Sequence, residues 1–185
     1  HRRSSAASDV YKRQTAGNAV PGLTIPIFAS MVAKIPALKI FEGLLFHRIK
    51  QRAVFFFIMK LAGLSKTMTL RPVDRIINRS HQAMTAHLDD LEQQLISSRG
   101  PWICGTQFTL ADVGMMVIFD RLREGDWLRL LVHNRPVLEA YWFALQRRPS
   151  YQQGCLAFEH PHVSAATAEL VGLKQAQRWP AGIPH

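Results

Sequence analysis

The chain has 185 residues, of which 48% are hydrophobic and 19% are charged, and its formal net charge is +10. This composition is typical of a soluble globular domain. The two cysteines, Cys104 and Cys155, lie far apart and fit no zinc-site spacing, which argues against a disulfide framework and favours a reducing, cytoplasmic compartment. The most apolar run, residues 53–64, contains Lys60 and is too short for the roughly 20 residues that a bilayer requires.

The first fourteen residues, HRRSSAASDVYKRQ, show neither helical periodicity nor the features of a signal peptide. They resemble the translated read-through of a sequencing adapter, and we expect residues 1–14 to be a non-native scar. The scar contains four basic residues and one aspartate, so it contributes three of the ten net charges. We expect the natural chain to begin upstream of it.

Two helical patterns follow, at 16–34 and 37–62, with a break near Pro36. We interpret both as buried helices of a soluble bundle. The alternative is peripheral contact between a membrane and the basic, apolar segment 39–60. For the basic run HRIKQR (47–52), a solvated helix face is favoured over phosphate binding, because no aromatic cluster is available for base stacking. We expect no nucleic-acid partner.

The clearest pattern is a helix of about 26 residues that starts near residue 71. Pro72 suits its first turn, and Gly100 with Pro101 provides its end. Steps of three and four place one set of side chains on a single stripe: Val73, Ile76, Ile77, Ser80, Met84, Leu88, Leu91 and Leu95.

The stretch GTQFTLADVGMMVIFDRL (105–122) predicts a second helix with a strong start signal. Thr109 can act as N-cap while the Asp112 carboxylate accepts the Thr109 backbone N–H, which is a capping box. Phe108 can pack on Val113 as a hydrophobic staple. Residues 113–119 have no polar face, so we expect a wholly enclosed central helix and a structural role for these four residues.

A third helix is predicted from Pro136 to Pro149 by apolar side chains at helical spacing, and a short helix follows at about 150–158. The apolar positions are Leu138, Tyr141, Trp142 and Leu145. Beyond Pro161 the pattern weakens to at most a turn at 164–173, so we expect residues 161–185 to be a tail. Neither strand alternation nor hairpin turns occur, and the prediction is an all-α bundle over residues 15–160.

Few side chains suggest chemistry. Cys104 and Cys155 lack a cationic partner or helix N-terminus and are expected to be inert. His160 and His162 have no acidic or sulfur ligand nearby, so a loop is favoured over a metal site. His81 and His87 are six residues apart and are expected to be partly exposed polar positions. We predict no catalytic residue and no metal site.

Two motifs resemble the C-terminal all-α domain of cytosolic glutathione transferases. The first pattern, [FY]-[ST]-x-A-D, is present as Phe108, Thr109, Ala111 and Asp112. The second pattern opens and closes with Arg-Pro pairs, and its members here are Arg135, Pro136, Val137 or Leu138, Trp142, Arg148, Pro149, Ser150 and Tyr151. The resemblance covers residues 70–158 closely and 16–69 loosely. It implies a glutathione S-transferase C-terminal-like helical bundle. The longer segment at 35–70 resembles bacterial relatives of ganglioside-induced differentiation-associated proteins.

In this family the glutathione thiolate attacks a hydrophobic electrophile, and glutathione is the co-substrate. The resemblance implies that glutathione binding and thiol activation by Ser, Tyr or Cys reside in an N-terminal thioredoxin-like domain. Residues 15–24 are too short to hold that domain. We therefore expect a detoxifying, homodimeric parent enzyme and an inactive chain on its own.

By position, Phe28 and Met31 are candidates for the wall of the electrophile pocket, although core packing is favoured for both. The alternative function is a non-catalytic helical module for protein interaction, as occurs on translation factors and synthetases.

Overall fold

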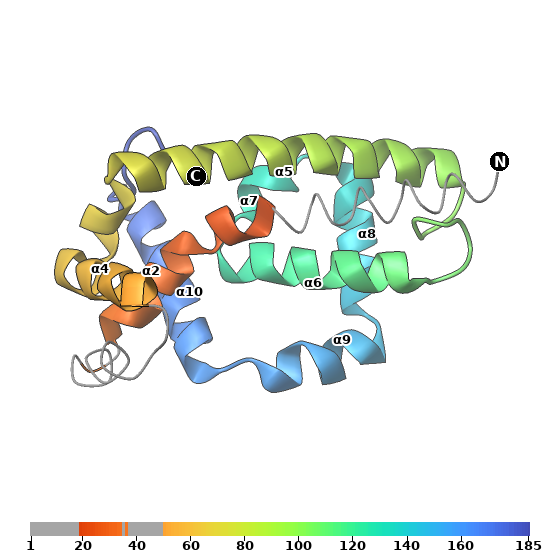
Figure 1. Ribbon diagram of the computed structural model, residues 1–185. Coiled ribbons are helices and arrows are strands. Elements are labelled where there is room, and N and C mark those ends of the chain that lie inside the picture. Colours follow the sequence, from red (N-terminus) through yellow and green to blue (C-terminus); the bar gives the residue numbers. More distant parts are fainter. Residues whose placement is uncertain (1–18, 35, 37–49) are drawn as a thin grey trace.

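The computed structural model describes residues 19–34, 36 and 50–185 (Figure 1). Within these ranges no strand is formed, and the fold is an all-α bundle. Its helices are α2 (Ile25–Lys34), α4 (Lys50–Met68), α5 (Arg71–Ser98), α6 (Leu110–Glu124), α7 (Leu128–Leu131), α8 (Pro136–Gln146), α9 (Pro149–Gly154), the 3₁₀ helix η1 (Leu156–Phe158) and α10 (Pro161–Gln175).

The longest helix, α5, runs along the whole length of the molecule, and α6 lies below it (Figure 1). α6 contacts α7, α8 and α10, so it is packed between helices from several parts of the chain. In Figure 1, α8 crosses near one end of α6, and α10 crosses near the other end, beside α2 and α4. This arrangement makes α6 the central helix, as the sequence predicts.

The N-terminal helices are less regular than their sequence pattern suggests. Residues 19–23 are helical, and a turn at Thr24 precedes α2. Pro26 has no backbone N–H, so one backbone hydrogen bond of the helix is missing at this point. Further on, α4 bends at Gly63, whose φ of 70° is readily adopted by glycine. Of the helix predicted at 37–62, residues 37–49 lie outside the described residues. From residue 50 onward the chain forms α4, which ends at Met68.

The stripe predicted on α5 is confirmed with one correction. Most of its members are buried, but Ile76, at the edge of the stripe, is 49% exposed. The helix ends at Arg99, which has a left-handed backbone. In the following loop, a Cβ on Gly100 would come within 2.3 Å of the Gly105 carbonyl, so the tight packing of the two backbones requires glycine.

The C-terminal segment belongs to the helical body, unlike the tail expected from sequence. α10 packs against α2 and α6, and Leu170, Trp179 and Ile183 are buried in the core. The buried positions along α10 are Ala166, Leu170 and Lys174. Because two of these three buried positions are an alanine and a lysine, the sequence of α10 shows little apolar periodicity. The helix could therefore not be recognised from the pattern beyond residue 160. The helical domain therefore extends past the boundary expected at residue 160.

Lys174 fixes the end of α10 to the turn between α6 and α7. Its ammonium group donates to the backbone carbonyl of Asp126 at 2.6 Å and lies 3.0 Å from the carboxylate of the same residue. It also lies 4.9 Å from the ring centroids of Trp127 and Trp179. Burial lowers the pKa of Lys174, and the Asp126 carboxylate opposes this shift.

Candidate functional site

The Asp112 carboxylate organises the start of α6. It is fully buried and accepts the backbone N–H of Ile103 at 3.0 Å and that of Thr109 at 2.8 Å. It also accepts the hydroxyl groups of Tyr141 and Thr109, each at 3.0 Å. The Thr109 hydroxyl in turn accepts the N–H of Ala111 at 3.2 Å, and the capping box is complete. Four donors saturate this carboxylate, so it acts as a structural acceptor that joins the loop, α6 and α8.

Phe108 packs on side chains of the loop before α6 and of the segment after α8. Its ring makes an edge contact with Trp102 at 5.0 Å between centroids, and the Arg148 guanidinium lies 3.6 Å from its centroid. Val113, the expected partner, is 40% exposed. Arg148, from the second Arg-Pro motif, thus secures the loop before α6 by stacking on its aromatic rings.

A second buried cluster holds the other end of α6. Asp120 accepts the Tyr151 hydroxyl at 2.8 Å and Nε of Arg123 at 2.9 Å. The same guanidinium donates to Glu159 at 2.6 Å, and Ser164 donates to the other oxygen of Glu159 at 2.6 Å. These bonds connect α6 to α9, to the segment after η1 and to α10. Sequence analysis missed this cluster, although an Asp and an Arg three residues apart directly after an apolar run are a usable signal.

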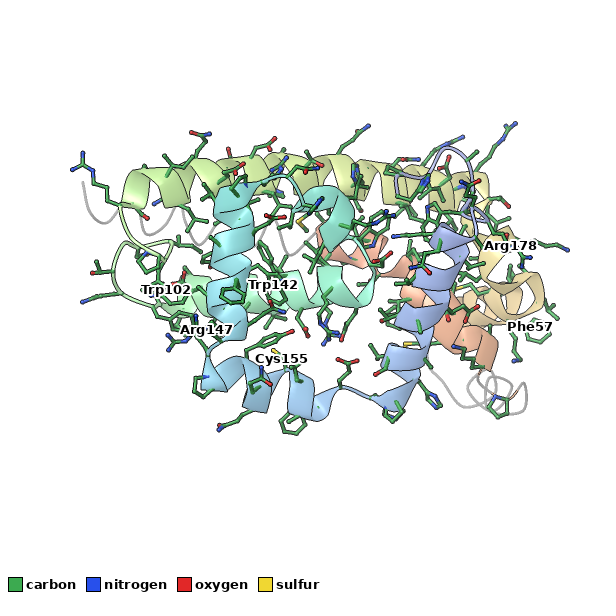
Figure 2. All side chains as sticks on the ribbon, turned by 180° about the vertical axis from the view of Figure 1, so that it is seen from behind. Phe57, Trp102, Trp142, Arg147, Cys155 and Arg178 are labelled. Carbon is green, nitrogen blue, oxygen red and sulfur yellow. The ribbon has the colours of Figure 1, made fainter. Side chains whose placement is uncertain are left out.

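The electrostatics of this cluster do not favour nucleophilic chemistry. Burial raises the pKa of Glu124, although the Arg121 guanidinium opposes the shift. Burial also raises the pKa of the Cys155 thiol, so the reactive thiolate is disfavoured. Cys155 is half-buried beside α9 (Figure 2), in agreement with an inert cysteine. Cys104, by contrast, is exposed rather than packed in an apolar setting.

The prediction that residues 113–119 form a wholly enclosed helix is wrong for one face. Met115, Met116, Ile118 and Phe119 are buried, whereas Val113 and Val117 are 40% and 46% exposed. Leu110 belongs to the same face because it lies three residues before Val113. We call these three residues the α6 apolar face; it is open because no helix among the described residues covers it.

The two pocket candidates are neighbours on α2. Phe28 is 49% exposed, and Met31 is half-buried against the core. They do not line the groove of about 360 Å³ that lies between α8 and the end of α5 with its following loop. That groove is lined by Leu95, Gly100, Pro101, Pro136, Val137, Ala140, Tyr141 and Ala144, so it is almost wholly apolar.

The histidines form no metal centre in the described part of the chain, where no group of three or more potential ligands occurs. The rings of His160 and His162 lie 4.8 Å apart between centroids and are tilted by 45°, and Nδ1 of His160 accepts the His162 N–H as the N-cap of α10. The pair therefore starts a helix, where the sequence suggests a loop. His81 is half-buried beside Trp127, and burial lowers its pKa.

Tyr141 gives a prediction on pH dependence. Burial, reinforced by the adjacent Asp112 carboxylate, raises the pKa of its phenol far above the usual value. The unfolded chain then loses this proton near pH 10 while the folded chain retains it, so the stabilisation is present below about pH 10 and declines as pH rises further. We expect the stability advantage of the wild type over Tyr141→Phe to shrink by up to about 1.4 kcal/mol per pH unit above pH 10. Urea titrations of both proteins at several pH values measure this; an advantage independent of pH would contradict it.

Comparison with known proteins identifies part of this architecture. Residues 78–153 match the family model described as glutathione S-transferase, C-terminal domain. The match runs from within α5 to α9. It includes the whole Asp112 cluster and, of the second cluster, Asp120, Arg123 and Tyr151, whereas Glu159 and Ser164 lie beyond its end. A search of curated proteins and a search of solved structures found no match. None of the helices in the described ranges combines the length and the apolar character needed to span a bilayer.

Proposed function

We propose that this glutathione S-transferase C-terminal-like domain is the helical half of a cytoplasmic, homodimeric transferase that conjugates glutathione to hydrophobic electrophiles, with a detoxifying role. The match over residues 78–153 carries the proposal, because the family description names a C-terminal domain. In this proposal a thioredoxin-like half, upstream in the intact protein, binds glutathione and activates its thiol.

The α6 apolar face supports a partner domain. Leu110, Val113 and Val117 are one contiguous row on the central helix, and such a row is usually covered in a finished protein. The titratable groups around α6 are engaged in buried hydrogen bonds, so they serve the fold and leave thiol activation to the other half. We assign Phe28 and Met31 to the wall of the electrophile pocket, where the exposed ring of Phe28 is available to an apolar ligand.

The test begins with recovery of the gene sequence upstream of this chain. We expect it to encode a thioredoxin-like half, and we expect the full protein to conjugate glutathione to an aryl halide, measured by absorbance. The 185-residue chain alone should show no rate above buffer. In the full protein, Phe28→Ala should raise KM for the electrophile and leave KM for glutathione unchanged. Phe143→Ala, which removes an exposed phenylalanine from α8, is the matched control.

A different result would favour the second candidate function. An unrelated upstream domain, or a complete protein without glutathione affinity, would contradict the transferase and support a non-catalytic interaction module.

A further inference from the structure

Helix α4 presents an apolar stripe to solvent. Val54, Phe57, Ile58 and Leu61 follow the i, i+3, i+4, i+7 spacing that places side chains on one helix face. All four are exposed, and Leu61 reaches 73%. Met59, on another face of the same helix, is buried. An amphipathic helix normally turns such a stripe toward the core, so an outward stripe indicates an interaction surface. We call these four residues the α4 stripe.

The surroundings of the α4 stripe are cationic. Residues 43–73 contain no Asp or Glu, and they contain six Lys or Arg: Arg48, Lys50, Arg52, Lys60, Lys66 and Arg71. Several cations at the junction of α4 and α5 and in the nearby C-terminal segment are exposed: Lys66, Arg71, Arg75, Arg79 and Arg178. Figure 2 shows Phe57 and Arg178 at the same end of the molecule.

These cations are not neutralised by ion pairs. Within the described ranges, none of those five exposed side chains forms an ion pair, whereas Arg123, Arg135 and Lys174 all do. The carboxylate of Asp74, in the first turn of α5, accepts a hydrogen bond from Asn78 at 2.6 Å. This end of the molecule is therefore complementary to a surface that is both anionic and able to receive apolar side chains.

We propose that the α4 stripe docks on the surface of an anionic lipid bilayer. The four apolar side chains enter the boundary between headgroups and acyl chains, and the exposed cations lie at the level of the anionic headgroups. A second copy of the chain fits less well, because two cation-rich surfaces would face each other. A nucleic acid would satisfy the cations but would leave the stripe in water. The inference rests on α4 and the exposed cations near it, and it does not depend on the transferase proposal.

Flotation with lipid vesicles tests this with the full 185-residue chain. We expect at least about tenfold stronger partitioning onto vesicles of phosphatidylcholine with about 30 mol% phosphatidylserine than onto pure phosphatidylcholine. About 0.5 M salt should remove most of that preference by screening. Ile58→Gln with Leu61→Gln should weaken partitioning roughly tenfold or more, because two apolar side chains are lost from the contact.

The matched control is Leu110→Gln, which makes the same change at a leucine that is 80% exposed on α6. It should bind vesicles like the wild type, and circular dichroism should show equal helix content in all variants. Equal partitioning onto neutral and anionic vesicles would overturn the proposal. Unchanged vesicle binding by the Ile58→Gln, Leu61→Gln variant would also overturn it. If the chain is an oligomer without lipid and this variant is a monomer, the stripe binds a second copy, and the proposal is overturned. Tight binding of a nucleic acid that survives the double substitution, without vesicle binding, would also overturn it.

Discussion

Replacement of Asp112 by alanine is expected to destabilise the fold by about 3 kcal/mol or more. Its carboxylate accepts four hydrogen bonds in a fully buried position, and the N–H of Ile103 and the hydroxyl of Tyr141 are among the donors. Removal of the side chain leaves these buried donors without partners and also eliminates the cap of α6. Urea denaturation followed by tryptophan fluorescence measures the loss.

Asp90→Ala is the matched control, because Asp90 is an exposed aspartate on α5. We expect its midpoint to differ little from that of the wild type, since surface substitutions of this kind usually change stability by less than about 0.5 kcal/mol. Similar losses for Asp112→Ala and Asp90→Ala would contradict the assignment of Asp112 as the organising acceptor.

Replacement of Arg123 by methionine is expected to cost about 3–5 kcal/mol. Arg123 neutralises Asp120, which is almost fully buried, and also pairs with Glu159. The variant keeps most of the side-chain volume but leaves Asp120 as an uncompensated buried charge. Thermal or urea unfolding of the purified chain measures the change.

Two further variants separate charge from packing in this cluster. Arg129→Met changes an exposed arginine on α7 and should leave stability nearly unaltered. Adding Asp120→Asn to Arg123→Met should recover part of the loss, because the buried charge is then removed. A double variant that is less stable than Arg123→Met would show that the cost arises from packing instead of charge.

The two motifs that resemble glutathione transferases now have a physical explanation. Asp112 binds Tyr141 at one end of α6, and Asp120 binds Tyr151 at the other end. Arg135, also a member of the second motif, pairs with Asp89 at 2.6 Å and so fixes the start of α8 to α5. The motif residues thus hold the central helix and its neighbours in place, and they lie within the region of the family match.

The sequence by itself determined the helical class, the start and end of α5, and the capped start of α6. These features depend on local physics: apolar spacing along one helix, a proline in the first turn, and a side chain that can reach a backbone N–H three residues away. The capping box of Thr109 and Asp112 can be predicted from the sequence because both partners of the bond lie within one helical turn.

Only the tertiary structure decided which apolar side chains are covered. Val117 and Met116 are neighbours of similar hydrophobicity, yet Val117 is exposed and Met116 is buried, because the helices that the structure describes around α6 pack against some of its sides only. The partners of Asp120 and the burial of Lys174 likewise depend on residues that are distant in sequence. Local patterns specify where a helix forms; the positions of its neighbours specify which of its faces meets water, and that information is spread over the whole chain.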